Sequence, residues 1–254
     1  MRVYQETLGF KKEDGNTTLA MVLLTILILG ILFVASLKLN VLDLRGSTIA
    51  LFIGAFISFI GSIYWLILML IFVASSFIAT KAFFKTKKLM KVQEGQNGER
   101  KASNVTYAAV TGIIITFIYA LYPHMQNYFF ELFAISFAVI NSDTFASEIG
   151  VIDKKVYMIT NFKKVNPGVN GGVSLTGELA ALLGGFIIAI SYSLFAYRSV
   201  QAYPVALVTL AGFAGCQIDS VLGSLFENRG KLNKGQVNFL ASFLTVAASA
   251  ALIV

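Results

Sequence analysis

The chain has 254 residues, of which 57% are hydrophobic and only 13% are charged. A soluble domain carries roughly a quarter charged residues, so this composition excludes an ordinary soluble protein and indicates a polytopic α-helical membrane protein. The formal net charge of +7 follows a membrane pattern along the chain, so we expect membrane lipids and no nucleic acid as partners.

Long apolar runs predict an all-α bundle of about seven membrane spans in a single domain, residues 1–254. The spans lie at 18–36, 47–80, 103–122, 127–147, 175–197, 203–226 and 236–254. About 20 helical residues cross the hydrocarbon core. The second run is too long for one straight crossing, so it is a tilted helix or a half-inserted helix followed by a crossing, with Gly61 near the break.

The distribution of Lys and Arg predicts which ends of the spans face the cytoplasm. Four segments hold 17 of the 20 basic residues: the one before Thr18, and residues 81–101, 150–174 and 227–235. Cytoplasmic loops are enriched in Lys and Arg, so these segments and the N-terminus are predicted to be cytoplasmic in the cell membrane. This alternation requires residues 47–80 to cross once, which leaves the C-terminus outside.

The chain has one cysteine, Cys216, and one histidine, His124. A single cysteine excludes an intrachain disulfide and a zinc cluster built on thiolates. We interpret His124, in "LYPHMQ", as a residue of the turn between two spans. Ser-His-Asp chemistry and haem ligation therefore have no support in this sequence.

Acidic residues gather near the predicted cytoplasmic ends of the spans. Asp143 and Glu148 close the fourth span, Glu178 opens the fifth and Asp219 lies near the end of the sixth, whereas Glu131 lies near the outer face, where we expect it to snorkel. An acid at the bilayer centre costs about 2.5–3.5 kcal/mol on insertion scales, so such residues usually pair or act in a site.

The carboxylates in "NSDTFASEIG" and "GCQIDSVLGSLFENRG" suggest a divalent-cation site. Asp143 and Glu148 lie about 140° apart on a regular helix, so they hold one ion together only if the helix unwinds near Ser147. Asp219 offers the same chemistry at the same depth. Oxygen ligands favour Mg²⁺ over transition metals. The alternative is a polar helix end whose side chains bond only to neighbouring helices.

The segment "NPGVNGGVSLTGELAALLGG" combines a glycine-rich turn with the start of a helix. Its glycines permit positive φ and close backbone approach, and Ser174 or Thr176 can cap the helix. Such a turn gathers free N–H donors that suit phosphate, although a plain tight turn is the alternative. The small residues that follow predict close packing between helices; they are Gly177, Ala181 and Gly184.

The basic segment "KTKKLMKVQEGQNGERK" is either a solvated loop that touches anionic lipid headgroups or a source of cations for substrate phosphates. Carboxylates for a divalent ion, a donor-rich loop and lysines would then meet at the cytoplasmic face, next to lipid. This combination is typical of phosphoryl or nucleotidyl transfer onto a lipid.

Four stretches of the chain carry a family resemblance: "SDTFASEIG", "NPGVNGGVSLTGELAALLGG", "IDSVLGSLFE" and "VNFLAS". They resemble the ordered motifs of the integral-membrane family that includes plant phytyl-phosphate kinase and many archaeal and bacterial members. "LDLRGSTIALFIG", "SSFIATKAFFKTKK" and Arg100 with Asn104-Val105 are similar too. Phe145 stands where Trp is expected. More distantly, the chain is similar to dolichol kinase and CDP-diacylglycerol synthase.

The resemblance implies a phosphotransferase that converts an isoprenoid monophosphate to the diphosphate, with CTP or another nucleotide such as ATP as donor and Mg²⁺ as cofactor. By this resemblance, Mg²⁺ would be held by Asp143 and Asp219, with Glu148 holding or orienting a second ion. The residues expected to bind phosphates are Asn170, Gly171, Gly172 and Ser174 of the loop, with Lys81, Lys85 or Arg100 neutralising charge.

Two other functions fit the sequence. A membrane transporter also uses intramembrane acids and broken helices, but it predicts acids near the midplane and inverted repeats, and no clear repeat is present. A CTP-dependent nucleotidyltransferase acting on a lipid phosphate would use the same groups as the kinase.

Overall fold

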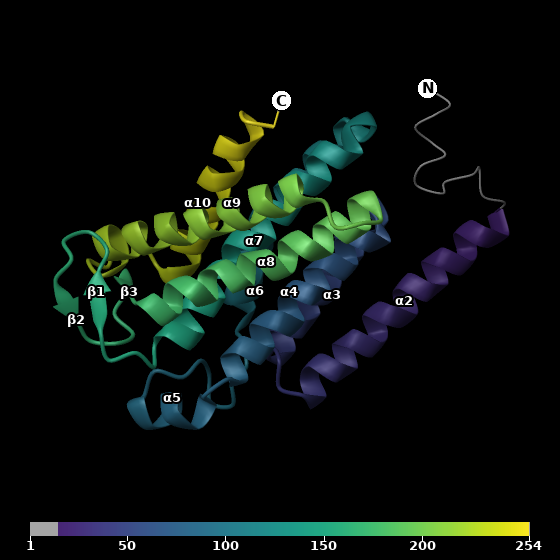
Figure 1. Ribbon diagram of the computed structural model, residues 1–254. Helices are drawn as coiled ribbons and strands as arrows, with labels where there is room; N and C mark the ends of the chain where they lie inside the picture. The colour runs from purple at the N-terminus through teal and green to yellow at the C-terminus, as the bar shows by residue number, and fades with distance from the viewer. Residues whose placement is uncertain (1–14, 254) are drawn as a thin grey trace.

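The computed structural model describes the backbone of residues 15–253 and the side chains of residues 22–253. The structure is a bundle of helices with one small sheet at one end (Figure 1). The long helices are α2 (Gly15–Lys38), α3 (Leu44–Ile60), α4 (Ile63–Lys81), α6 (Ala102–Leu121), α7 (Gln126–Gly150), α8 (Leu175–Tyr197), α9 (Ala202–Leu222) and α10 (Lys234–Ala250). The short elements are α5 (Phe84–Met90), η1 (Pro123–Met125), η2 (Gly223–Glu227), β1 (Val156–Met158), β2 (Lys164–Val165) and β3 (Gly172–Val173).

The predicted all-α membrane bundle is confirmed. In the described part of the chain, five helical segments are long and apolar enough to cross a membrane: Ile63–Lys81, Ala102–Leu121, Pro123–Gly150, Leu175–Tyr197 and Ala202–Glu227. Val22–Lys38 of α2 and Leu44–Ile60 of α3 are shorter apolar helices. The seventh predicted span corresponds to α10, a helix of 17 residues.

The predicted second span, residues 47–80, is two helices rather than one. Helix α3 ends at Ile60. The N–H of its C-cap, Gly61, donates to the Ile57 carbonyl at 2.9 Å, and Ser62 is extended before α4 begins. A Cβ at Gly61 would lie 2.9 Å from the Trp65 ring, so only glycine fits this turn. The predicted break near Gly61 is therefore correct.

Helices α3 and α4 run antiparallel, because the start of α3 and the end of α4 meet the same segment. The Asp43 N–H, just before α3, donates to the Arg100 carbonyl at 3.2 Å, and Arg100 Nη2 donates to Thr80 Oγ1 at 3.4 Å near the end of α4. The prediction that residues 47–80 cross once is thus wrong. The error arose because an apolar run that is interrupted only by Gly-Ser looks continuous in sequence.

We call the end of the bundle that contains Thr80 and Arg100 the polar end, and the opposite one the far end. Helix α2 is antiparallel to α3, since Ser36 and Ser47 share a hydrogen bond of 2.9 Å and Leu29 packs beside Gly54. The start of α2 therefore lies at the far end (Figure 1). The start of α2 and the polar end thus lie at opposite ends of the bundle, whereas the sequence predicted that the segment before the first span and the polar loops share the cytoplasmic side; the basic residues Arg2, Lys11 and Lys12 lie outside the described residues.

Helix α7 is the centre of the bundle and is buried along most of its length between α8, α9, α4, α6 and α10. Its tightest neighbour is α8. A Cβ at Gly184 would lie 2.7 Å from the Asn141 carbonyl oxygen, and one at Gly150 would lie 2.7 Å from the Cα of Gly177. The predicted packing role of the small residues in α8 is confirmed, because any side chain there would separate the two helices.

Two kinds of contact hold α7 in place. In the far half, Trp65 stacks on Phe130 at a centroid distance of 5.5 Å and packs at a tilt against Phe133 at 4.6 Å. Nearer the polar end, the buried Asn141 accepts hydrogen bonds from Ser75 and Ser76 of α4 and donates to the Gly184 carbonyl of α8. Hydrogen bonds between the helices are thus present one helical turn before the polar end is reached.

A three-stranded sheet closes the polar end between α7 and α8. Strand β1 lies between β2 and β3 and is antiparallel to both, with Val156 opposite Val165 and Tyr157 opposite Val173. The sequence predicted only a loop here, because strands of two or three residues are too short for a period of two to be visible. The sheet fixes the position of the glycine-rich segment.

Candidate functional site

A polar cavity of about 380 Å³ opens at the polar end. It is bounded by the ends of α7 and α9, the starts of α8 and α10, the segment 91–94 and the glycine-rich loop. Seven of the predicted site residues line this cavity: Asp143, Glu148, Asn170, Gly171, Gly172, Ser174 and Asp219. Predicted site residues that lie up to 76 positions apart in the chain, Asp143 and Asp219, therefore converge on one space.

Asp143 and Asp219 are neighbours in this cavity. They come from α7 and α9, which run parallel here, since Gly212 packs against Ala138 and Gly215 against Val139. The two carboxyl groups are close enough to interact directly. Neither has a cation paired with it within the salt-bridge distance among the described residues, so the pair is available to a ligand.

Helix α10 adds two polar side chains beside this pair. Oriented to satisfy its neighbours, the Asn238 amide nitrogen donates to Asp219 Oδ2 at 2.9 Å and to the Lys234 carbonyl at 3.1 Å. Lys234 lines the cavity. Burial alone would lower the pKa of Lys234, but the nearby Asp143 and Glu94 carboxylates outweigh burial and raise this pKa. The carboxylates of the cavity therefore favour the charged form of Lys234.

Glu148 forms an ion pair with a lysine that was not among the predicted site residues. Lys87 of α5 is fully buried, and its Nζ lies 2.5 Å from Glu148 Oε2. The same Nζ donates to the Thr80 carbonyl at 2.6 Å, while Thr80 Oγ1 donates to Glu148 Oε1 at 3.2 Å. Both oxygens of Glu148 thus have protein partners, and the ion pair attaches α5 to the wall of the cavity.

The glycine-rich loop is pressed against the end of α9. Gly171 has φ = +77°, and a Cβ there would lie 2.6 Å from the Ser220 carbonyl oxygen. The positive φ and close approach expected of this loop are thus confirmed at Gly171. Asn228 Nδ2 donates to the Asn170 carbonyl at 2.9 Å, and α9 changes to the π-helical segment η2 beside it. π-Helical turns frequently occur at functional sites.

Ser174 is the N-cap of α8, so Ser174 rather than Thr176 is the correct one of the two predicted caps. Its hydroxyl accepts from the Gly177 N–H at 3.2 Å and faces the Gly150 carbonyl at 3.4 Å. Thr176 instead bonds to Asp153. The Ser174 hydroxyl therefore holds the ends of α7 and α8 together, which positions Asp143 and the loop.

The three predicted cations outside the loop occupy different surroundings. Lys81 bonds to the Asn97 carbonyl and lies over the rings of Phe77 and Phe84. Lys85 is exposed on α5. Neither residue lines the polar cavity. Arg100 bonds to Thr80, which in turn bonds to Glu148, so it lies beside the cavity and its charge acts on Asp143.

The carboxylates fit one particular kind of metal binding. No group of three or more His, Cys, Asp or Glu side chains among the described residues forms a ready-made metal cage. Mg²⁺ is usually bound by one or two carboxylates plus waters and substrate phosphates rather than by an all-protein cage. The Asp143–Asp219 pair matches that donor set, whereas Glu148 is already occupied by Lys87 and Thr80.

Lys87, Lys234 and Asn238 are site residues that were not predicted from the sequence. Lys87 sits in a run of lysines that looks like a solvated face, so the sequence carries no signal of its burial. For Lys234 the sequence does contain a signal of a special role. This lysine stands in the first turn of α10, just after the N-cap Asn233, where the helix dipole disfavours a cation. Asn238 belongs to the quoted "VNFLAS" motif but was given no role.

This fold and cavity define a multi-pass membrane protein with a hydrophilic site where its helices end. The chain belongs to the family described as "Integral membrane protein DUF92", whose family model matches residues 27–246. It is 30% identical to "Uncharacterized membrane protein MJ0933" of Methanocaldococcus jannaschii over 91% of this chain and 94% of the relative.

Two plant proteins from Arabidopsis thaliana are also similar. "Protein VTE6, chloroplastic" is 31% identical over 59% of this chain and 46% of its own length, and "Protein PGR" is 36% identical over 37% and 36%. No solved structure matches the chain. The matches to the family model and to these relatives confirm the family that the motifs indicated.

Proposed function

We propose that this protein is a membrane-embedded phosphotransferase that converts a prenyl monophosphate, such as a phytyl-type phosphate, to the diphosphate. The donor is a nucleoside triphosphate, CTP or ATP. The observation that carries the proposal is the convergence of Asp143, Asp219, Lys234 and the glycine-rich loop on one polar cavity at the end of an apolar bundle. The family resemblance of the motifs supports the same reaction.

The proposed reaction requires little acid–base catalysis from the protein. An oxygen of the prenyl phosphate attacks the γ-phosphorus of the nucleotide, and the bond from that phosphorus to the β,γ-bridging oxygen breaks. The products are the prenyl diphosphate and the nucleoside diphosphate. The attacking phosphate is already an anion, so no general base is needed, and catalysis consists of positioning and charge stabilisation.

In this proposal, some side chains stabilise charge and others hold groups in position. Asp143 and Asp219 would hold Mg²⁺, which when bound neutralises charge on the nucleotide phosphates. Lys234 stabilises negative charge at the transferring group, and the loop around Gly171 gives the phosphates a close backbone surface. Glu148, with both oxygens bonded, positions the end of α7 rather than binding an ion.

The decisive experiment identifies the product. Protein in nanodiscs is incubated with Mg²⁺, geranylgeranyl phosphate and CTP or ATP labelled either at the γ-phosphate or in the base. Kinase activity transfers only the γ-label to the lipid. A lipid carrying the base label would instead show nucleotidyl transfer, and a lipid carrying neither label would leave a carrier as the remaining reading and contradict the proposal.

A further inference from the structure

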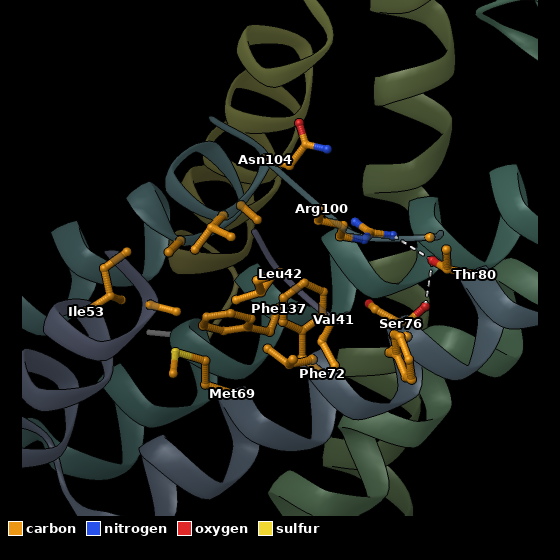
Figure 2. Close-up of a pocket in the computed structure, with 17 residues that line it drawn as sticks. Val41, Leu42, Ile53, Met69, Phe72, Ser76, Thr80, Arg100, Asn104 and Phe137 are labelled. Carbon is orange, nitrogen blue, oxygen red and sulfur yellow. Dashed lines mark hydrogen bonds between the residues drawn. The ribbon is translucent and has the colours of Figure 1, made fainter. Parts of the chain in front are cut away.

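A second cavity, of about 50 Å³, lies between α3, α4, α6 and α7 (Figure 2). Its walls are mostly apolar and include Leu42, Ile53, Met69, Phe72 and Phe137. Such a volume has room for about three or four water molecules, and apolar cavities in proteins stay dry and take up small apolar groups. The occupant that fits is hydrocarbon.

The polar residues of this cavity are gathered at one end. Ser76, Thr80, Arg100 and Asn104 lie there, and Figure 2 shows Arg100 directed at Thr80 above the apolar side chains. An apolar space with a guanidinium at its mouth is complementary to an amphiphile with an anionic head and a hydrocarbon tail, because Arg binds phosphate through several N–H donors.

This mouth adjoins the polar cavity. Thr80 accepts from Arg100 and donates to Glu148, which lines the polar cavity, and the Arg100 charge acts on Asp143. Along α7, Phe137 of the apolar cavity and Asp143 of the polar one are separated by about 9 Å of helix, at 1.5 Å per residue. A phosphate and the first branched unit of its chain can bridge this separation.

We propose that this apolar cavity binds the methyl branch of the first isoprene unit of the lipid substrate, with Arg100 holding the phosphate at the junction of the two cavities. The inference rests on the proposed function for the nature of the lipid. It assigns Arg100 a substrate-binding role that is separate from the carboxylate pair, and it makes the small side chains of α6 at the cavity, Ala108 and Ala109, determinants of which lipid is accepted.

The test measures binding without any nucleotide, so that it does not depend on transfer. Labelled geranylgeranyl monophosphate is titrated into nanodiscs that contain wild type, Ala108→Leu or Ala206→Leu. The last is the matched control, because Ala206 is exposed on α9. We expect Ala108→Leu to weaken binding by about tenfold or more by filling the cavity, and the control to bind like wild type.

Three outcomes would overturn the inference: no binding by wild type, equal affinity in Ala108→Leu, or equal competition by phosphatidic acid, which carries straight acyl chains. A thermal unfolding curve accompanies each variant, and Ala109→Val replaces Ala108→Leu if the latter is unfolded. Tight binding without diphosphate formation would contradict the proposed function alone. Normal turnover by Ala108→Leu, whose apolar cavity is filled, would contradict only the proposed role of that cavity in lipid binding.

Discussion

Lys87 and Glu148 form an ion pair in which the Lys87 side chain is 1% exposed and that of Glu148 10%. Removing one partner of a buried pair leaves an uncompensated charge and costs about 3–5 kcal/mol, whereas replacing both can be nearly neutral. The pair also connects α5 to α7 beside the polar cavity.

Lys87→Met is expected to destabilise the protein by about 3–5 kcal/mol, because Glu148 would keep its burial and lose its cation. The double variant Lys87→Met/Glu148→Gln is expected to recover most of that loss. Chemical unfolding in detergent micelles measures both. A single variant as stable as wild type would show that the pair does not form.

Lys234 allows a prediction about chemistry at the same scale. Replacing it by Met removes the cation beside Asp143 and is expected to lower kcat by about 100-fold or more, in the range found for loss of a preorganised charge-stabilising group. Lys234→Arg keeps the charge and should retain part of the activity. Steady-state rates with varied nucleotide check this; full turnover in Lys234→Met would remove the residue from the site.

At the scale of elements, apolar runs and turn chemistry predicted most of what the structure contains. Helical spans, the Ser174 cap and the small face of α8 follow from local rules, since each depends on residues close in sequence. The convergence of Asp143 and Asp219 could also be expected, because both lie near the same end of their spans. Their roles remain predictions.

What the sequence did not reveal depends on tertiary packing. The burial of Lys87 results from α5 folding back on α4 and α7, which no spacing within "KTKKLMK" encodes. The α3–α4 hairpin turns in two residues, so its apolar run looked continuous. Asn238 needs α9 beside α10 before its amide meets Asp219.

The glycine-rich loop gives a prediction at the element scale. Gly171→Ala is expected to cost about 1–2 kcal/mol from its positive φ alone and more from the contact with the Ser220 carbonyl, and to lower turnover by displacing the loop. Gly230→Ala is the matched control, since Gly230 also has positive φ, +67°, but nothing lies within 4 Å of its Cβ position. Equal unfolding temperatures for the two variants would contradict the close packing at Gly171.

For the whole molecule, the antiparallel α3–α4 pair determines which helix ends lie at the same end of the bundle. The start of α2 and the end of α10 lie at the far end, and the lysine-rich loops and the site lie at the polar end. From the enrichment of Lys and Arg in cytoplasmic loops, we predict that the polar end faces the cytoplasm and that the start of α2 and the end of α10 face the opposite side.

Single cysteines introduced into a Cys216→Ala background test this topology. A cysteine at Phe162, in the exposed turn between β1 and β2, should react with a membrane-impermeant maleimide only after cells are opened. A cysteine at Val200, between α8 and α9, should react in intact cells. A cysteine in a tag placed before Met1 should also react in intact cells. Labelling of the N-terminal tag only in opened cells would contradict the orientation of α2.

The central claim is that Asp143 and Asp219 act together on phosphate at the polar end. Its most direct test is transfer of the γ-phosphate label to geranylgeranyl phosphate by nanodisc preparations of wild type, Asp143→Asn, Asp219→Asn and the control Asp153→Asn, all matched for unfolding temperature. We predict product from wild type and Asp153→Asn and none above background from the other two. Wild-type turnover in either Asp143→Asn or Asp219→Asn would contradict the account.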